Sequence, residues 1–83
     1  MHIVYIIESL SSGKWYYGYT SDPIKRLEAH NAGFNKSTRN RGPWKFIFQR
    51  TFIDKSEALK FEIHLKKLRR KEYILSKYSP YFL

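Results

Sequence analysis

The sequence predicts an α+β domain whose elements run strand, strand, helix, strand, helix, helix. Two short runs of β-branched and aromatic residues come first, separated by a turn rich in serine and glycine, and a third run alternates across its two faces. Two later segments repeat apolar residues at helical spacing. No linker or repeat divides the 83 residues, so residues 1–83 are expected to form one domain with a modest core and a shallow site.

The first two runs, His2–Ile7 and Lys14–Thr20, predict an antiparallel hairpin around the turn Ser9–Gly13. Successive side chains of a strand point to opposite faces of the sheet. Tyr5 and Tyr16 are therefore each expected to stand on a defined face, beside the helix that follows.

The first helix is predicted from its caps. Ser21 and Asp22 are good N-cap residues, Pro23 suits the first helical position, and Gly33 is expected to end the helix. The residues that recur on the face expected to point inward are Ile24, Leu27 and Asn31.

The segment 35–43 is polar and basic and predicts a loop, and Trp44–Gln49 has the alternation of a third strand. Asp54 and Glu57 resemble a capping box that starts a second helix. Its apolar face is formed by Ala58, Phe61, Leu65 and Leu68. The segment Glu72–Tyr78 either extends this helix or forms a short third one, and the apolar tail 81–83 is expected to pack back on the domain.

Sixteen lysines and arginines against seven acids give a net charge of +9, which favours a polyanionic partner, with nucleic acid as the first candidate. Ribosomal and membrane-surface proteins are equally basic, so the residue pattern has to decide. The absence of cysteine excludes disulfides and thiolate zinc sites, and it fits a cytoplasmic protein. No apolar run approaches a membrane span, and Met1–Leu10 lacks the features of a secretory signal. No membrane association is expected, and no protein partner is evident.

The candidate catalytic residues are Tyr5, Tyr16, Arg26 and His30. Phosphodiester hydrolysis needs a proton acceptor, a fixed positive charge and a proton donor, and this set supplies all three. Arg26 and His30 are four residues apart, so they are neighbours on the helix surface and are expected to face the sheet. The alternative is ordinary sheet packing for the tyrosines and a solvated charged face for the helical pair.

Glu62 lies between Phe61 and Leu65, on the helix face that should point inward. Burying an unpaired carboxylate is costly, so Glu62 either pairs with a cation such as Arg26 or binds a metal ion. None of the other acids is expected to be a second catalytic carboxylate.

Taken together, these residues resemble the GIY-YIG nuclease superfamily, and most closely its small stand-alone bacterial single-domain members. The resemblance covers nearly the whole chain and rests on Val4-Tyr5-Ile6, Tyr16-Tyr17-Gly18 with its motif glycine Gly18, Arg26, His30 and Phe61-Glu62-Ile63. It implies a three-stranded antiparallel sheet flanked by helices. It also implies hydrolysis of a nucleic-acid phosphodiester with one divalent metal ion.

By this resemblance Glu62 would hold Mg²⁺, which keeps several waters and takes phosphate oxygens as ligands, and Mn²⁺ should substitute. Tyr5 would be the general base, which requires Arg26 and the metal to lower its pKa by about three units, or roughly 4 kcal/mol. Arg26 would stabilise charge on the phosphate, and His30 and Tyr16 would position water or phosphate. Whether Tyr5 or His30 takes the proton first stays open, because histidine has the more suitable intrinsic pKa.

The chain departs from the motif name at Ile3, where glycine is expected, and at Tyr17, where isoleucine is expected. Tyr19 stands where some members carry lysine. The late asparagine that follows the metal-binding glutamate in some members has no counterpart here, so the group that would position the leaving phosphate is not identified.

Cations of the loop and the second helix are expected to contact the nucleic-acid backbone, with a solubilising surface as the alternative: Lys36, Arg39, Arg41, Lys45, Lys66, Lys67, Arg69, Arg70 and Lys71. Phosphate contacts carry no sequence information, so weak specificity and strong salt dependence are expected. The leading hypothesis is a metal-dependent DNA endonuclease. The rivals are a nucleic-acid-binding module with weak or silent catalysis, and an RNA-directed nuclease.

Overall fold

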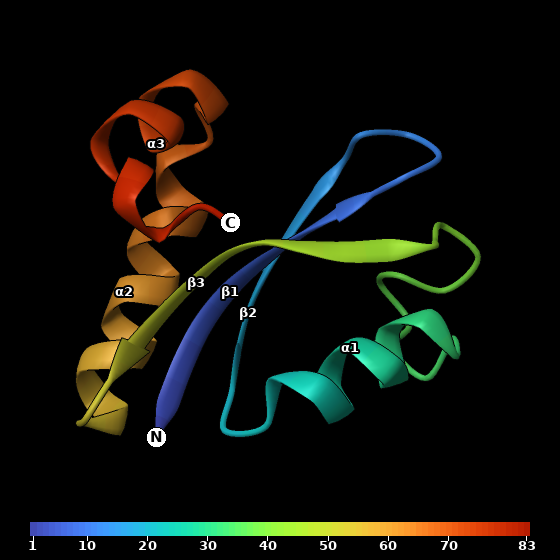
Figure 1. Ribbon diagram of the computed structural model, residues 1–83, viewed down its shortest axis with the longest axis horizontal. Helices are drawn as coiled ribbons and strands as arrows, with labels where there is room; N and C mark the ends of the chain where they lie inside the picture. The colour runs from blue at the N-terminus through green and yellow to red at the C-terminus, as the bar shows by residue number, and fades with distance from the viewer.

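The computed structural model describes residues 1–83. Its elements are β1 (His2–Ser9), β2 (Trp15–Thr20), α1 (Pro23–Asn31), β3 (Trp44–Phe52), α2 (Lys55–Leu68), α3 (Lys71–Lys77) and a 3₁₀ turn (Ser79–Tyr81). Figure 1 shows α1 on one side of the strands and α2 with α3 on the other. The α+β class and the order of its elements are confirmed. No helix is long and apolar enough to cross a membrane.

The three strands form one antiparallel sheet in the order β2-β1-β3. The first strand of the chain is therefore the central one. Its run Val4–Ile7 is fully buried, and such a continuous apolar run is typical of a strand whose two faces are both covered. In this register Tyr5 lies opposite Gly18 of β2 on one side and Gln49 of β3 on the other.

The sheet separates two apolar clusters. The larger one lies beneath α2 and α3 and consists of Val4, Ile6, Phe48, Ala58, Leu65 and Ile74. The smaller one lies on the α1 face and consists of Tyr5, Ile7 and Trp44, with Leu27 packed against it. The candidate catalytic tyrosine thus belongs to the smaller cluster, where fewer apolar side chains surround it.

Helix α1 has the predicted bounds and caps. The Asp22 carboxylate accepts the Lys25 N–H at 3.2 Å, and Gly33 adopts a φ of +82° just past the helix end. The expected apolar face is wrong at Ile24, which is 71% exposed. This short helix packs on the sheet through Leu27 and the buried His30, while Asn31 uses its side chain for hydrogen bonds instead of burial.

Helix α2 begins at the predicted cap, but the capping box is incomplete. The Asp54 carboxylate accepts the N–H of Ser56 at 3.0 Å, whereas Glu57 makes no return hydrogen bond to the cap. The helix ends because Arg69 adopts a left-handed φ of +56°. This reversal makes α3 a separate helix, which decides between the two predicted alternatives.

The C-terminal residues pack back on β3, as the sequence predicts. Phe82 forms a β-bridge with Phe48, and the Leu83 N–H donates to the Ile47 carbonyl at 2.9 Å. Arg50 completes this contact: its guanidinium lies 4.9, 4.6 and 4.8 Å from the ring centroids of Phe52, Phe61 and Tyr81, respectively. Cation–π attraction therefore joins β3, α2 and the last turn.

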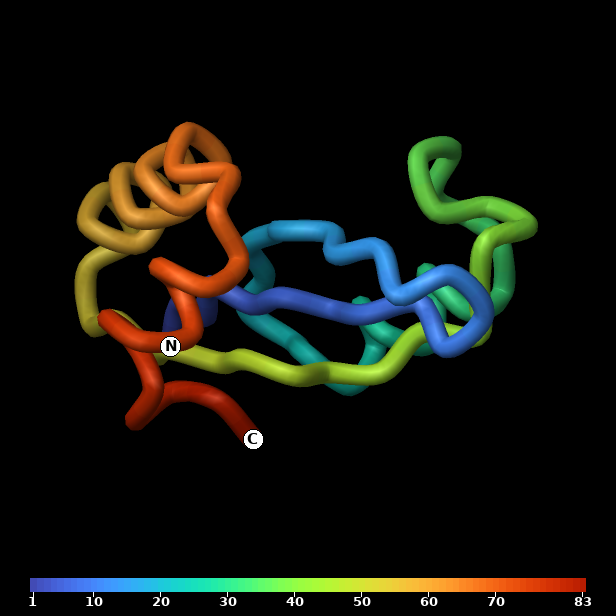
Figure 2. The backbone as a smooth tube through the Cα atoms, turned by 90° about the horizontal axis from the view of Figure 1, so that it is seen from above, coloured from blue at the N-terminus to red at the C-terminus, as the bar shows by residue number.

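Viewed along the sheet, α2 and the loop 35–43 both project past the β2 edge, with β2 lying between them (Figure 2). The expected basic residues of the loop and of the last turn of α2 are therefore carried on the two elements that flank this edge.

Candidate active site

The two motif tyrosines occupy neighbouring strands, and Gly18, two residues after Tyr16, makes room for Tyr5. Tyr5 and Gly18 are cross-strand partners. A Cβ atom added to Gly18 would overlap the ring and the hydroxyl of Tyr5, because the phenol lies directly across the glycine. Only glycine lets the Tyr5 side chain turn toward the β2 edge at this position.

The Tyr5 hydroxyl meets both helical side chains. His30 Nε2 lies 2.8 Å from Tyr5 Oη, and Arg26 Nε donates to the same oxygen at 3.1 Å. Tyr5 is fully buried, His30 is 2% exposed and Arg26 is half-buried. Arg26 and His30 thus face the sheet, as their spacing predicts, and they do not form a solvated charged face.

The protonation states of Tyr5 and His30 limit which atom can donate in the hydrogen bond between them. Burial raises the pKa of Tyr5 above its usual value, although Arg26 opposes the change, so the phenol keeps its proton. The resemblance assigns a lowered pKa of Tyr5 to Arg26 and the metal ion together. Arg26 by itself does not lower the pKa below its usual value, because desolvation outweighs the guanidinium. Burial, reinforced by Arg26, lowers the pKa of His30 to about 4, so its imidazole is neutral at pH 7.

The hydrogen-bonded chain continues past His30 into the loop. His30 Nδ1 lies 2.8 Å from Thr38 Oγ1, and Thr38 is 1% exposed. The Trp44 indole N–H donates to the Thr38 carbonyl at 3.2 Å, while Asn31 bonds the Trp44 backbone at both N and O. Sequence reasoning missed Thr38, because a threonine within a polar loop carries no periodic signal.

Tyr16 completes the cluster from β2. Its ring lies edge-on to His30 with centroids 5.0 Å apart, and its hydroxyl accepts a 3.4 Å hydrogen bond from the Asn35 amide. The hydrogen bond to Tyr5, together with the nearby hydroxyl of Tyr16, raises the pKa of Arg26 further above its usual value. The cluster therefore keeps a fixed positive charge between two phenol oxygens.

Glu62 is largely buried, with its side chain 16% exposed, and it pairs with Lys66 at 3.2 Å. The sequence predicts either a cation partner, such as Arg26, or a metal ion for Glu62. The cation that pairs with the carboxylate is Lys66, one helical turn along α2 on the same face. The negative charge of Glu62 contributes to the raised pKa of Tyr5, so the carboxylate lies within electrostatic reach of the phenol. No group of three or more histidine, cysteine or acidic side chains forms a metal cluster.

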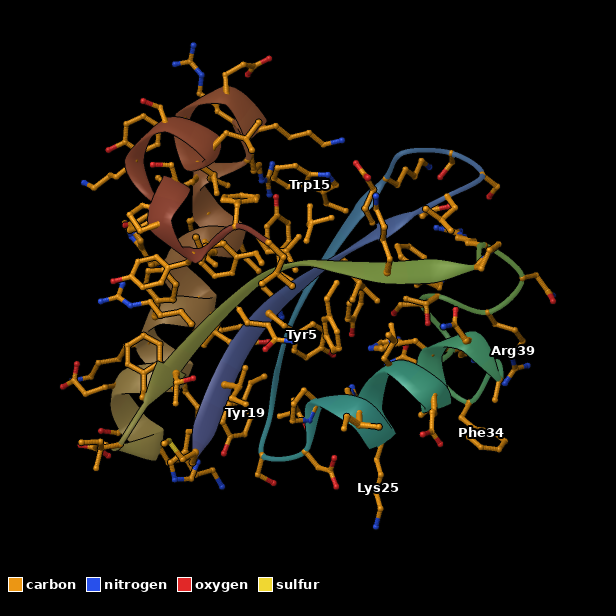
Figure 3. All side chains as sticks on the ribbon, in the orientation of Figure 1. Tyr5, Trp15, Tyr19, Lys25, Phe34 and Arg39 are labelled. Atoms are coloured by element: carbon orange, nitrogen blue, oxygen red, sulfur yellow. The ribbon has the colours of Figure 1, made fainter.

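The predicted nucleic-acid-binding cations are all exposed: Lys36, Arg39, Arg41, Lys45, Lys66, Lys67, Arg69 and Arg70. Figure 3 shows Arg39 on the loop and Lys25 on the outer side of α1, where Lys25 points away from the sheet. Lys71 is exposed but structural, since its ammonium donates to the Gly13 carbonyl at 2.9 Å and lies 5.0 Å from the Trp15 ring centroid.

Comparison with known proteins shows the family to which the chain is similar. The GIY-YIG catalytic domain family matches residues 1–79. The chain belongs to the GIY-YIG family. This membership supports a nuclease-type function, in which the protein acts on nucleic acid. The strands that carry Tyr5 and Tyr16 both lie within the matched residues.

The relatives of this GIY-YIG chain are small proteins. It is 42% identical to UPF0213 protein BH0048 of Halalkalibacterium halodurans, covering 96% of this chain and 88% of that one. It is 40% identical to UPF0213 protein YazA of Bacillus subtilis, covering 86% and 72% respectively. The solution NMR structure of BH0048 matches 90% of this chain and 82% of its own with a TM-score of 0.58 at 41% sequence identity.

Proposed function

We propose that this protein is a metal-dependent endonuclease that hydrolyses DNA phosphodiester bonds with little sequence specificity. The observation that carries the proposal is the convergence on Tyr5 Oη of a neutral imidazole at 2.8 Å and a guanidinium at 3.1 Å. A proton acceptor and a fixed cation at one oxygen serve acid-base chemistry on a phosphate. A packing role for Tyr5 would require neither.

In the proposed step Tyr5 is the general base and His30 receives its proton. Water attacks phosphorus and loses a proton to Tyr5 Oη, while the phenol proton passes to His30 Nε2. The bond from phosphorus to the leaving oxygen breaks as the new bond forms. Such a relay does not require a free phenolate, so a Tyr5 pKa raised by burial is compatible with it.

Arg26 has two functions in this scheme. Its guanidinium caps Tyr5 Oη, and Tyr5 has no exposed surface. A bound phosphate would draw Arg26 away from the phenol, because a charge-assisted bidentate contact is stronger than the bond to a neutral hydroxyl. This movement would expose Tyr5 Oη to water only when substrate is present.

The acidic residue available to a metal ion is Glu62. One carboxylate suits Mg²⁺, which retains waters and completes its shell with phosphate oxygens, and Mn²⁺ is expected to substitute. The ion would neutralise phosphate charge when bound. The contribution of this chain is the Glu62 oxygen, which Lys66 at 3.2 Å has to release.

Nicking of supercoiled plasmid with and without Mg²⁺ tests the proposal. We expect Arg26→Ala and Glu62→Gln each to reduce nicking by at least about 100-fold, since each removes charge stabilisation and not core volume. The matched controls are Lys25→Ala and Glu28→Gln, which remove exposed charges from α1. Full activity in Arg26→Ala or Glu62→Gln would disprove the mechanism.

The competing function is a nucleic-acid-binding module with weak or silent catalysis. The complete burial of Tyr5 favours it, because no water reaches the phenol in the absence of substrate. A preparation that binds DNA in a salt-sensitive manner and never nicks it, with either Mg²⁺ or Mn²⁺, would support this alternative. The same assay with labelled RNA separates a DNA nuclease from an RNA-directed one.

A further inference from the structure

We infer that Thr38 is a positioning residue that holds His30 in the tautomer able to accept the Tyr5 proton. The inference rests on the proposed function for its catalytic meaning, but the tautomer can be measured without substrate. Thr38 lies eight residues beyond His30, in the loop 35–43, and its hydroxyl is the partner of His30 Nδ1 at 2.8 Å.

Counting the available donors shows which atom donates in each hydrogen bond from Arg26 through Tyr5 and His30 to Thr38. A guanidinium can only donate, so Arg26 Nε–H fills one acceptor position of Tyr5 Oη. The phenol proton then needs an acceptor of its own, and His30 Nε2 at 2.8 Å is the group that can accept it. A neutral histidine with an unprotonated Nε2 carries its proton on Nδ1. That proton is donated to Thr38 Oγ1.

The opposite tautomer would leave a buried donor unpaired. If the Thr38 hydroxyl donated to Nδ1, His30 Nε2 would carry the proton and would donate to Tyr5. The Tyr5 O–H would then face a second donor and Arg26, neither of which accepts. An unsatisfied buried hydroxyl costs about 1 to 3 kcal/mol, so the contacts of Tyr5 disfavour this tautomer, and the Thr38 oxygen supplies the acceptor that the other tautomer needs. With Nδ1 protonated, the Tyr5 hydroxyl, both ring nitrogens of His30 and the Thr38 hydroxyl all have partners of the required kind.

The loop holds Thr38 in place from the opposite side. The Thr38 hydroxyl lies 3.5 Å from the Asn35 carbonyl, to which it donates, and its own carbonyl receives the Trp44 indole N–H at 3.2 Å. Asn31, one residue after His30, binds the Trp44 backbone. Helix α1, the loop and β3 therefore fix the distance between His30 and Thr38.

The side chains next to this contact leave room for substitution. A pocket of about 420 Å³ lies beside it and includes His30, Thr38 and Asn40 in its lining. Thr38→Val keeps the shape of the side chain and removes only the hydroxyl. Thr38→Ser keeps the hydroxyl and removes a methyl group. The pair separates hydrogen bonding from packing at one position.

The test is the ¹⁵N spectrum of the histidine rings in the full chain, with His30 assigned by comparison with His30→Gln. We expect wild type and Thr38→Ser to show a protonated Nδ1 and an unprotonated Nε2 at pH 7. We expect Thr38→Val to shift His30 toward the Nε2-protonated form, because Nδ1–H has lost its acceptor. The neighbouring exposed hydroxyl variant Ser37→Ala is the control and should match wild type.

Activity provides the second measurement. We expect Thr38→Val to lower kcat for nicking by about tenfold or more with little change in KM, and Thr38→Ser to restore most of it. A wild-type His30 protonated on Nε2 would overturn the inference, and so would an unchanged tautomer in folded Thr38→Val. If Thr38→Val fails to fold, the spectra of wild type and Thr38→Ser still decide. Failure of nicking alone would count against the proposed nuclease and not against the tautomer.

Discussion

At the scale of single residues, the contact between Tyr5 and Gly18 explains why the second motif carries a glycine. The phenol crosses from the central strand over the neighbouring one, and the space that it uses is the space of a missing side chain. The same placement brings Tyr5 Oη to both Arg26 and His30. The missing side chain at Gly18 therefore both gives the Tyr5 ring its space and lets Tyr5 Oη reach Arg26 and His30.

We expect Gly18→Ala to destabilise the protein by about 1 to 3 kcal/mol, the range for overpacking a buried contact. It should also abolish nicking, because the added methyl group displaces the Tyr5 ring. Urea denaturation measures the first effect. Combining Gly18→Ala with Tyr5→Leu, which removes the overlapping ring, should recover part of the lost stability. Strict additivity of the two substitutions would mean that the overlap is not the cause.

We expect the protonation of His30 to make the stability of the protein depend on pH. Its pKa is about 4 in the folded protein and 6.5 when unperturbed, so between these values the unfolded chain binds a proton that the folded one does not. As far as His30 is concerned, the free energy of unfolding should be highest above pH 6.5. It should fall by up to about 3 kcal/mol as the pH drops toward 4.

Urea denaturation across pH 4 to 7 measures this dependence, with His30→Gln as the comparison. All other ionisable groups are the same in both proteins, so the difference between the two curves isolates His30. The His30→Gln curve should be flatter between pH 6.5 and 5. Parallel curves would show that His30 titrates normally and is not held neutral.

Sequence patterns identified Tyr5, Tyr16, Arg26 and His30 as neighbours because each lies on an element with a regular period. They could not identify Thr38, whose position depends on how the loop 35–43 folds back over α1. Sequence patterns also could not predict the direction of the pKa shift of Tyr5. Its direction is decided by complete burial, which depends on packing between elements and not on local spacing.

At the scale of elements, the break between α2 and α3 occurs at a residue poorly suited to it. Arg69 adopts a left-handed φ of +56°, a conformation that costs an ordinary L-residue roughly 1 to 2 kcal/mol and costs glycine little. We expect Arg69→Gly to raise the free energy of unfolding by about 0.5 to 1 kcal/mol, as measured by urea denaturation.

Arg70→Gly is the matched control for this prediction. It removes the same charge at the adjacent exposed position, where φ is −110° and glycine brings no relief. The control should be neutral or slightly destabilising. A stabilisation of equal size in both variants would point to relief of charge repulsion, not to backbone conformation.

The helices and strands were largely predictable because caps and alternation are local signals. Asp22 and Pro23 placed the start of α1 correctly, and Trp44 placed the start of β3. The errors arose where tertiary contacts decide. Ile24 has an apolar side chain at a helical position, yet no element covers it. For Glu62 the sequence predicts a cation partner or a metal ion, and only the structure identifies the cation as Lys66 of the same helix.

At the scale of the whole molecule, the exposed cations on the loop and on the last turn of α2 lie on the two elements beside the β2 edge (Figure 2). Each phosphate neutralised on double-stranded DNA contributes about −0.9 to the slope of log K against log salt. We expect replacing Lys36, Arg39 and Arg41 together by glutamine to make this slope about three units less negative.

The control is a triple glutamine variant of equal charge at Lys25, Lys55 and Lys60, which are exposed and lie outside both groups. Fluorescence anisotropy with a labelled duplex at several salt concentrations gives both slopes. If the two triple variants weaken binding equally, net charge and not the placement of cations governs affinity.

The packing of Phe82 and Leu83 on β3 has a consequence for association between molecules. A bare strand edge is a template on which another chain can add its own strand, and long flat edges lead to aggregation. The bridge to Phe48 and the bond to Ile47 occupy the middle of the β3 edge, and Arg50 holds the adjoining turn in place. These two residues thus protect the sheet against intermolecular strand addition, and a protein lacking them would self-associate through β3.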